Sequence, residues 1–268
     1  MTEKTRVAIY GAAGRMGKRL IALAAADPAL EVAAAVEAAG HPLLGSDSGE
    51  AAGIGTNGIP LTDAIPESAA ADVVIDFSAP AALETLLGLC RARNLALVYA
   101  TTGLSEEQKA KLRAAAAEVP VLWSPSMSLT VNLTMKLAQI AAEALADKDA
   151  DVEIIEKHHR FKADAPSGTA LKFGQLIAEK MNLTGETHGR SGKPGARPHN
   201  EIGYHAVRIG DNPGEHNIIF GLLGETMELT VKATNRDAYA SGALSAAKFL
   251  AGKAPGRLYG MDDVLKLN

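Results

Sequence analysis

The chain has 268 residues, of which 47% are hydrophobic and 22% are charged, and its formal net charge is −4. This composition is typical of a globular protein long enough for two domains, and the charge excludes a general attraction to nucleic acid or anionic lipid. The single cysteine, Cys90, excludes an intramolecular disulfide and a cysteine-rich metal site. No stretch resembles a signal peptide or a membrane span, so we expect a cytoplasmic protein without a membrane partner.

Short apolar runs alternate with Ala- and Leu-rich helical patterns in the first half of the chain. The predicted strands cover 7–10, 32–36, 73–77, 95–100 and 121–123, and predicted helices follow Gly14, Pro80 and Ser105. This alternation is typical of an α/β fold with a parallel sheet. A long helical pattern over 128–146 then leads out of the first domain.

The pattern changes in the second half. A strand is predicted over 151–156, and a helix over 167–181 has Ser167 or Asp164 as its cap. Three further strands, predicted as an antiparallel meander because glycine-rich turns separate them, cover 201–209, 215–223 and 226–233. Residues 184–198, rich in Gly, Lys, Arg and Pro, are expected to form a mobile loop. The Ala-rich segment 237–250 predicts a helix that packs on the first domain.

Together these patterns predict two domains. Residues 1–127 with 237–268 are expected to form a Rossmann-type, doubly wound parallel sheet that binds a dinucleotide. Residues 128–236 are expected to form a second α+β domain with a mixed, largely antiparallel sheet, which binds the substrate and mediates oligomerisation. Unpaired strand edges in this domain could join between subunits.

A glycine-rich turn, GAAGRMG, lies between the first predicted strand and helix. Gly11, Gly14 and Gly17 would allow a tight turn, close approach of a pyrophosphate and close packing of helix on strand. Glu37, 20 residues after Gly17, ends the second strand, where it could accept hydrogen bonds from both ribose hydroxyls of an adenosine. The alternative is a glycine-rich turn with no ligand and a surface glutamate.

The same glutamate bears on the choice of cofactor. A carboxylate at Glu37 would repel a 2′-phosphate, and Ala38 and Ala39 offer no guanidinium to offset it. We therefore predict NADH over NADPH as the cofactor. Arg15 or Lys18 could still reach a 2′-phosphate, so use of NADPH stays open.

Positive charge is concentrated at 156–170, EKHHRFKADAPSGTA, where a predicted strand leads into a predicted helix. The cationic side chains after the strand include His158, His159, Arg160 and Lys162. Free N–H groups of Gly168 and Thr169 at the helix start also favour anions. The stretch predicts a pocket for a small anion with more than one carboxylate; the alternative is a solvated charged loop.

Neighbouring histidines also raise the question of a zinc site. The chain has no HExxH motif and no third ligand close in sequence to His158 and His159. His205 and His216 fall inside strand patterns, where a structural histidine is commoner. We therefore predict no metal site.

The long motif EIIEKHHRFKADAPSGTA resembles the signature of the 4-hydroxy-tetrahydrodipicolinate reductase (dihydrodipicolinate reductase) family of the bacterial diaminopimelate route to lysine. The resemblance extends over the chain through GAAGRMG at 11–17, VIDFS at 74–78, TTG at 101–103, GDNPGEH at 210–216 and MDDVLKLN at 261–268. It implies an oxidoreductase that uses NAD(P)H to reduce a small cyclic dicarboxylate with loss of water. It also implies a homotetramer, and a hinge that brings substrate and nicotinamide together.

The resemblance further implies roles for single residues. His158 matches the proposed proton donor, and Lys162 matches a lysine that binds a carboxylate and supports proton transfer. His159, Gly168 and Thr169 match substrate contacts. The residues implied in cofactor binding are Gly11, Ala13, Gly14, Arg15, Met16, Gly17, Glu37, Phe77, Ala100, Thr101, Thr102, Gly103, Ser126, Met127 and Arg236, the last of them near the hinge.

Three other functions are compatible with a nucleotide-binding fold of this kind, and particular residues argue against each. Aspartate-semialdehyde dehydrogenases need a nucleophilic cysteine, but Cys90 lies in a helical pattern where a packed thiol is expected. Sugar oxidoreductases of similar architecture usually carry Glu-Lys-Pro after a strand, where this chain has Ala-Thr-Thr-Gly. A non-catalytic NAD-binding sensor would need only the fold, but the presence of both His158 and Lys162 argues against it.

Overall fold

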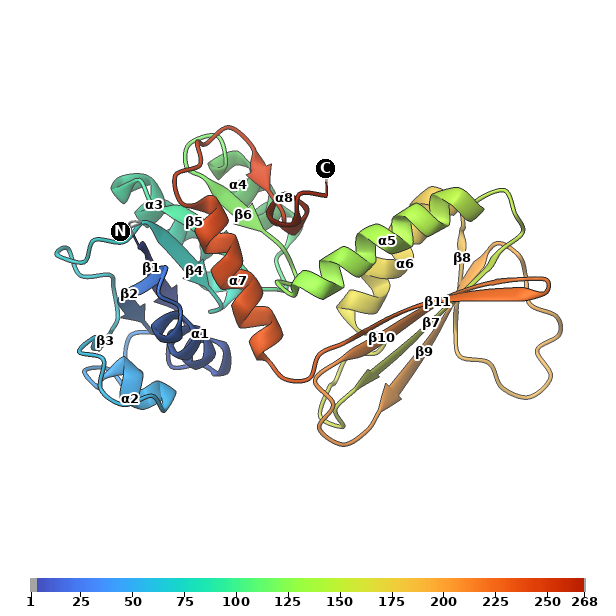
Figure 1. Ribbon diagram of the computed structural model, residues 1–268, viewed down its shortest axis with the longest axis horizontal. Coiled ribbons are helices and arrows are strands. Elements are labelled where there is room, and N and C mark those ends of the chain that lie inside the picture. The colour runs from blue at the N-terminus through green and yellow to red at the C-terminus, as the bar shows by residue number, and fades with distance from the viewer. Residues whose placement is uncertain (1–3, 268) are drawn as a thin grey trace. The chain divides into compact units, whose positions relative to one another are not determined.

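The computed structural model describes residues 4–267 (Figure 1). The chain divides into two compact units, one formed by Met1–Leu129 with Arg236–Asn268 and the other by Thr130–Asn235. The second unit therefore begins two residues later and ends one residue earlier than the range 128–236 expected from sequence.

A seven-stranded sheet forms the centre of the first unit. Its strands are β1 (Thr5–Tyr10), β2 (Leu30–Val36), β3 (Leu61–Thr62), β4 (Val73–Asp76), β5 (Ala96–Tyr99), β6 (Val121–Trp123) and β12 (Leu258–Tyr259). They lie in the order β12-β6-β5-β4-β1-β2-β3, and all neighbours are parallel. The order reverses between β1 and β4, which is the point where open α/β sheets bind ligands. The Rossmann-type sheet predicted from sequence is confirmed.

Helices cover both faces of this sheet. They are α1 (Arg15–Ala26), α2 (Ser48–Ala52), the 3-10 helix η1 (Pro80–Ala82), α3 (Leu83–Arg93), α4 (Glu106–Ala115), α7 (Asp237–Leu250) and α8 (Met261–Leu265). Successive strand residues enter opposite cores: Val7 and Ile9 pack with residues of α1 and α7, while Ala8 packs with residues of α3 and α4. The return of α7 to the first unit agrees with the sequence-based expectation.

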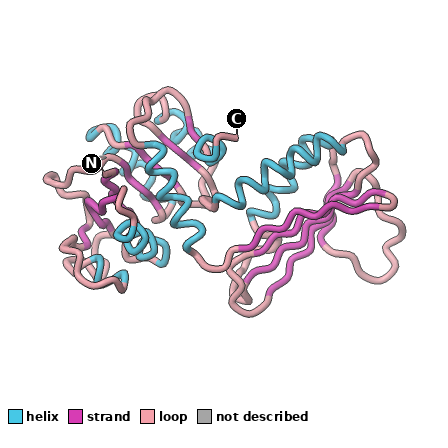
Figure 2. The backbone as a smooth tube through the Cα atoms, in the orientation of Figure 1, coloured by secondary structure: helices cyan, strands magenta, loops and turns pink. Residues whose placement is uncertain are grey.

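The second unit places two helices on one face of a five-stranded sheet, as the tube in Figure 2 shows. Its helices are α5 (Leu129–Leu145) and α6 (Gly168–Met181). Its strands are β7 (Asp151–His158), β8 (Gly185–His188), β9 (Glu201–Arg208), β10 (Glu215–Leu222) and β11 (Glu225–Lys232). Phe173 of α6 and Phe220 of β10 are fully buried in the shared core.

The predicted antiparallel meander is wrong in its pairing. β10 and β11 form an antiparallel hairpin, but the sheet order β11-β10-β7-β9-β8 puts β7 between β9 and β10. β7 pairs antiparallel with β10 and parallel with β9, and β8 is parallel to β9. The sheet is mixed as predicted, but with two antiparallel and two parallel pairs. The connection 209–214 is long enough to pass the end of β7, whereas a two-residue turn would force β9 and β10 to be neighbours.

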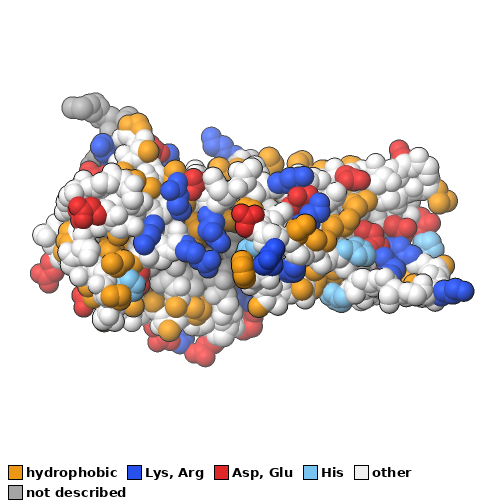
Figure 3. Space-filling view, turned by 90° about the horizontal axis from the view of Figure 1, so that it is seen from below, with side chains coloured by type: hydrophobic (Ala, Val, Ile, Leu, Met, Phe, Trp, Pro, Cys, Tyr) orange, Lys and Arg blue, Asp and Glu red, His pale blue; other side chains and the backbone are white. Residues whose placement is uncertain are grey.

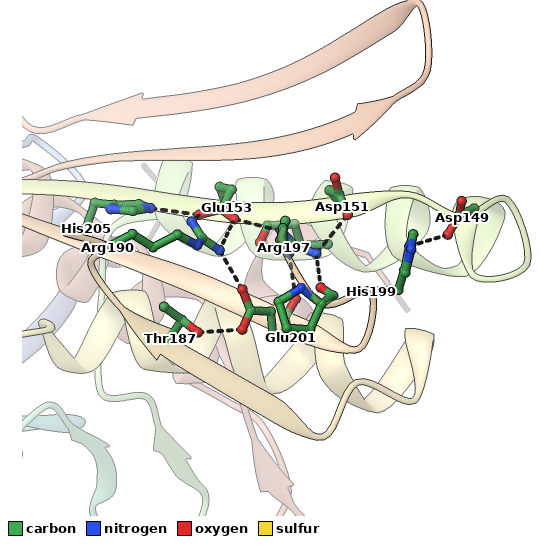
Figure 4. Close-up of polar contacts among 11 residues, drawn as sticks. Asp149, Asp151, Glu153, Thr187, Arg190, Arg197, His199, Glu201 and His205 are labelled. Carbon is green, nitrogen blue, oxygen red and sulfur yellow. Dashed lines mark hydrogen bonds and ion pairs between the residues drawn. The ribbon is translucent and has the colours of Figure 1, made fainter. Parts of the chain in front are cut away.

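Residues 184–198, expected to be a loop, contain strand β8. The two arginines of this segment hold it to the sheet: Arg190 binds Glu153 and Glu201, and Arg197 binds Glu153 (Figure 4). On the right of Figure 3, basic, acidic and histidine side chains of this unit lie next to one another. The loop expected here from the Gly-, Lys-, Arg- and Pro-rich composition is therefore partly a strand, and its two arginines are paired with carboxylates of β7 and β9.

Within residues 4–267, no helix combines the length and the apolar character that crossing a lipid bilayer requires.

Candidate active site

The glycine turn joins β1 to α1 under tight steric limits. Gly11 has φ of 74°, and a Cβ there would lie 2.8 Å from the carbonyl oxygen of Phe77. A Cβ on Gly17 would lie 2.2 Å from the carbonyl oxygen of Gly11, so α1 packs directly on the turn. Gly14 caps α1 without a side-chain hydrogen bond. The N–H groups at the start of α1, from Arg15 onward, therefore have no side-chain acceptor at the cap and suit an anion.

Glu37 lies against this turn, directly after β2. Its carboxylate accepts hydrogen bonds from the backbone N–H of Ala13, at 3.0 Å, and of Ala38, at 2.9 Å. The pairing of Tyr10 with Val36 brings the ends of β1 and β2 together and so places the carboxylate there. The acid and the glycine turn thus share one edge of the sheet, as a dinucleotide site requires.

A cavity of about 380 Å³ is lined by residues that follow β4, β5 and β6 and by the start of α7. It brings together eight of the predicted cofactor residues, namely Met16, Phe77, Ala100, Thr101, Thr102, Ser126, Met127 and Arg236. The lining residues that the sequence did not predict are Ser78, Ala79, Pro80, Pro125 and Tyr239. Gly103, also predicted, has φ of 81° and is not among the lining residues.

A buried carboxyl group, Asp76, supports two residues of this lining. Its side chain accepts hydrogen bonds from the Ser78 hydroxyl at 2.5 Å and from the Thr101 hydroxyl at 2.6 Å. Burial raises the pKa of Asp76, although these hydrogen bonds act in the opposite direction. Asp76 therefore fixes the side chains of Ser78 and Thr101 where β4 and β5 end.

The second group of candidate residues begins where β7 ends. Burial alternates along β7, so that Val152, Ile154, Glu156 and His158 share the face turned to the core. His158 is 7% exposed and Glu156 is 1% exposed. An acid and a histidine two residues apart on one strand thus lie side by side inside the unit.

Glu156 is bound from several directions. It accepts a hydrogen bond from Nδ1 of His158 at 2.5 Å and one from the backbone N–H of Ser167 at 3.1 Å. Both terminal nitrogens of Arg208, on β9, donate to it at 2.9 and 2.7 Å. Burial acts to raise the pKa of Glu156, but the hydrogen bonds from Arg208 and His158 outweigh burial and hold that pKa below its usual value.

Burial lowers the pKa of His158 below its usual value, and Lys162 and Arg208 act in the same direction. Hydrogen bonding and charge attraction from Glu156 oppose this lowering. Burial also lowers the pKa of His216, to about 4. The ring of His216 lies edge-on to that of His158, with 5.3 Å between centroids, so His158 has a largely uncharged aromatic neighbour on β10.

Helix α6 begins beside this cluster. Ser167 caps it by accepting a hydrogen bond from the backbone N–H of Ala170, and its hydroxyl is 3.0 Å from Nε2 of His216. Gly168 follows the cap, and a Cβ built there would meet no atom within 4 Å. The space beside Gly168 is therefore open, and the N–H groups of Gly168 and Thr169 belong to the first turn of α6, where helices favour anions.

Lys162 and His159 complete the predicted cluster on the loop after β7. Nζ of Lys162 lies 2.9 Å from Asp164, and the backbone N–H of Lys162 donates to the carbonyl of His159. Nδ1 of His159 has no hydrogen-bond partner within residues 4–267. Arg160 is exposed and is fixed by its backbone N–H, which donates to the carbonyl of Gly210.

Sequence reasoning missed Glu156 and Arg208 as parts of this site. The alternation of β7 does contain a signal for Glu156, because an acid on the apolar face of a strand needs a partner. No such signal marks Arg208, which meets Glu156 from 52 residues further along the chain. His216, taken from sequence as a structural histidine, is hydrogen-bonded and buried at 4% exposure.

Comparison with known proteins defines the family. Residues 5–127 match the model of the dihydrodipicolinate reductase N-terminus, and residues 130–265 match that of the dihydrodipicolinate reductase C-terminus. The chain belongs to the dihydrodipicolinate reductase family. The 4-hydroxy-tetrahydrodipicolinate reductase of Rhodopirellula baltica is 54% identical over 100% of this chain and 98% of its own length. That of Alkalilimnicola ehrlichii is 48% identical over 98% and 99% of the two chains.

A solved structure of the family has the same fold. The dipicolinate-bound dihydrodipicolinate reductase from a Paenisporosarcina species superposes with a TM-score of 0.76 at 26% identity, over 97% of this chain and 98% of that one. The family resemblance expected from the sequence motifs is therefore confirmed over the length of the chain.

Two alternatives can be compared with the structure. Cys90 lies in α3 at 0% exposure, and burial raises the pKa of its thiol to about 12, so it is unsuited to be the nucleophile of a semialdehyde dehydrogenase. Residues 4–267 contain no group of three or more His, Cys, Asp or Glu side chains arranged to hold a metal ion.

Proposed function

We propose that the chain reduces 4-hydroxy-tetrahydrodipicolinate to tetrahydrodipicolinate, with loss of water, in the diaminopimelate route to lysine. Membership of the dihydrodipicolinate reductase family supports this reaction. The observation that carries it is the cluster at the end of β7, where a histidine buried against a carboxylate lies beside Lys162 and the first turn of α6. Such a cluster suits a dicarboxylate that must receive a proton.

The first unit fits a nicotinamide dinucleotide. Close packing at Gly17, the cap at Gly14 without a side-chain hydrogen bond and the adjacent Glu37 suit the pyrophosphate and ribose. The cavity at the ends of β4, β5 and β6 suits the nicotinamide. When bound, the cofactor supplies a hydride to C4 of the conjugated product of dehydration.

The second unit provides the acid and the carboxylate contacts. His158 donates a proton to C3 of the resulting enamine, and Lys162 stabilises negative charge on the substrate. His159, Gly168 and Thr169 bind carboxylates. Burial holds the pKa of His158 low, and the negative charge of a bound dicarboxylate would raise it, favouring the protonated form when substrate is present.

The reaction can be tested directly. The unstable substrate is formed in situ from pyruvate and aspartate semialdehyde by the preceding synthase, and absorbance loss is followed for NADH and NADPH in parallel. Synthase-dependent oxidation of either cofactor is the expected result. Binding of NADH without any oxidation would overturn the reaction and favour the non-catalytic sensor.

For the cofactor we propose a preference for NADH. The unmutated chain should show a higher kcat/KM with NADH, because Glu37 repels a 2′-phosphate. Glu37→Gln should raise kcat/KM for NADPH by about tenfold, as expected for removal of one nearby like charge. Glu31→Gln, at an exposed position on β2, the strand that precedes Glu37, is the control and should change kcat/KM for neither cofactor. A strong preference of the unmutated chain for NADPH would contradict the proposal.

Gly168 tests the carboxylate site without disturbing the fold. Gly168→Ala should raise KM for the substrate about tenfold, the cost of weakening one hydrogen bond to a charged group. Its melting temperature should not fall, because the new methyl group meets no atom within 4 Å. Gly88→Ala in α3, whose methyl group would also meet nothing within 4 Å, is the control and should leave KM unchanged. An unchanged KM in Gly168→Ala would remove this residue from the substrate site.

The remaining parts of the proposal are a cytoplasmic location and a homotetramer. A single buried cysteine suits a reducing compartment. The sheet of the second unit has β8 and β11 as its edge strands, which suit pairing between subunits. Measurement of the native mass, against 27.8 kDa for one chain, would test the tetramer.

A further inference from the structure

Both oxygens of Glu156 are fully used as acceptors. Oε1 accepts from the backbone N–H of Ser167 and from one terminal nitrogen of Arg208. Oε2 accepts from the other terminal nitrogen of Arg208 and contacts Nδ1 of His158. A carboxylate that binds a guanidinium through both oxygens stays ionised and offers only acceptors. The hydrogen in the 2.5 Å contact must therefore belong to Nδ1 of His158.

This contact decides which nitrogen of the ring can exchange a proton. A neutral imidazole carries one N–H, and Glu156 holds that hydrogen on Nδ1. Nε2 of His158 makes no hydrogen bond within residues 4–267. We propose that Glu156, itself held by Arg208, is a positioning residue that keeps His158 in its Nδ1–H form and directs proton transfer through Nε2. The inference rests on the proposed role of His158 as the proton donor.

The charges around His158 give this arrangement a second effect. The groups that face the ring are Glu156 from β7, Arg208 from β9, His216 from β10 and Lys162 from the following loop. Glu156 is the negative member of this set and favours the protonated imidazole, whereas Arg208 and Lys162 oppose it. Removal of the charge of Glu156 should therefore lower the pKa of His158, and removal of the charge of Arg208 should raise it.

A second cluster on the same strand serves as an internal control. Like Glu156, Glu153 binds a histidine, with Nε2 of His205 at 2.7 Å, and it binds two arginines where Glu156 binds one (Figure 4). It lies on the opposite face of β7 from Glu156. Glu153→Gln breaks a comparable set of ion pairs, with two arginines in place of one, without touching His158. Any general effect of losing an ion-paired glutamate on this strand should appear in both variants.

The tautomer can be measured in the unmutated protein. Histidine labelled with ¹⁵N gives ring-nitrogen shifts that distinguish Nδ1–H from Nε2–H, and the signal missing from His158→Asn identifies residue 158. Above its pKa, His158 should be in the Nδ1–H form, against the usual preference of free histidine. An Nε2–H form would overturn the inference. This result does not depend on turnover, so it separates failure of the inference from failure of the proposed reaction.

Kinetics test the consequence for catalysis. Glu156→Gln should lower kcat roughly 10- to 100-fold near neutral pH with little change in KM, because less His158 is protonated. Activity that needs a protonated His158 falls as pH rises through the pKa of His158. This descending limb of the profile of kcat against pH should move to lower pH in Glu156→Gln and to higher pH in Arg208→Gln. Glu153→Gln should leave the descending limb at the pH found for the unmutated protein. If the descending limb stays in place in both Glu156→Gln and Arg208→Gln, and their losses of activity follow their falls in melting temperature, the role of Glu156 is purely structural. That result would overturn the inference.

Discussion

Replacement of Lys162 by alanine is expected to lower kcat/KM by about 10²- to 10³-fold, the usual cost of removing one charge that stabilises a transition state. The lysine lies on the loop after β7, and its charge already acts on His158. NADH affinity should be unchanged, because the proposed cofactor residues lie in the other unit. Kinetics with substrate formed in situ, together with NADH binding measured by fluorescence, provide the comparison.

The control for this variant is Lys172→Ala on α6. Within residues 4–267 its ammonium group hydrogen-bonds only Gln175, at 3.1 Å, so its removal should change neither kcat/KM nor NADH affinity. Unchanged turnover in Lys162→Ala would show that the lysine has no part in the reaction. Loss of NADH binding as well would mean that the substitution disturbs more than the substrate cluster.

Gly17→Ala is expected to destabilise the first unit strongly. The new methyl carbon would lie 2.2 Å from the carbonyl oxygen of Gly11 and 2.5 Å from Cα of Ala12, and both are backbone atoms that cannot rotate away. Such overpacking typically costs about 1–3 kcal/mol, and we expect the upper part of that range. At about 2–4 °C per kcal/mol, the melting temperature should fall by roughly 5–12 °C.

The NADH affinity of Gly17→Ala should fall together with its melting temperature, since α1 would have to move away from the glycine turn. Gly88→Ala is again the matched control, because its methyl group lies at an exposed helical position and should be neutral or slightly stabilising. A Gly17→Ala protein with normal melting temperature and normal NADH affinity would contradict the assignment of Gly17 to close helix–strand packing.

Much of the fold follows from local pattern. The period of apolar residues predicts the order of strands and helices, and each major predicted element is present within a few residues of its expected bounds. The two-residue strands β3 and β12 were missed, because a strand of that length shows no period. Their pairing depends instead on neighbouring β2 and β6.

The candidate site, like the fold, has parts that local sequence predicts and parts that it does not. Contiguous motifs identify the glycine turn, the loop after β7 and the start of α6, since each chemical group lies next to its neighbours in sequence. The cofactor cavity draws on separate segments, and its unexpected members, such as Ser78 and Tyr239, lie within a few residues of expected ones. Open α/β topology explains this, because it gathers the ends of successive strands at one edge.

The sequence by itself determined the types and order of the major elements other than β8, the position of the glycine turn and the presence of a cationic cluster before the start of α6. Only the tertiary structure decided that β7 lies between β9 and β10 and that Arg208 reaches Glu156. Local periodicity states which face of a strand a side chain takes, but not which distant strand lies beside it. Which strands become neighbours depends on packing over the whole unit. The arrangement of the strands in turn brings together the charges that surround His158.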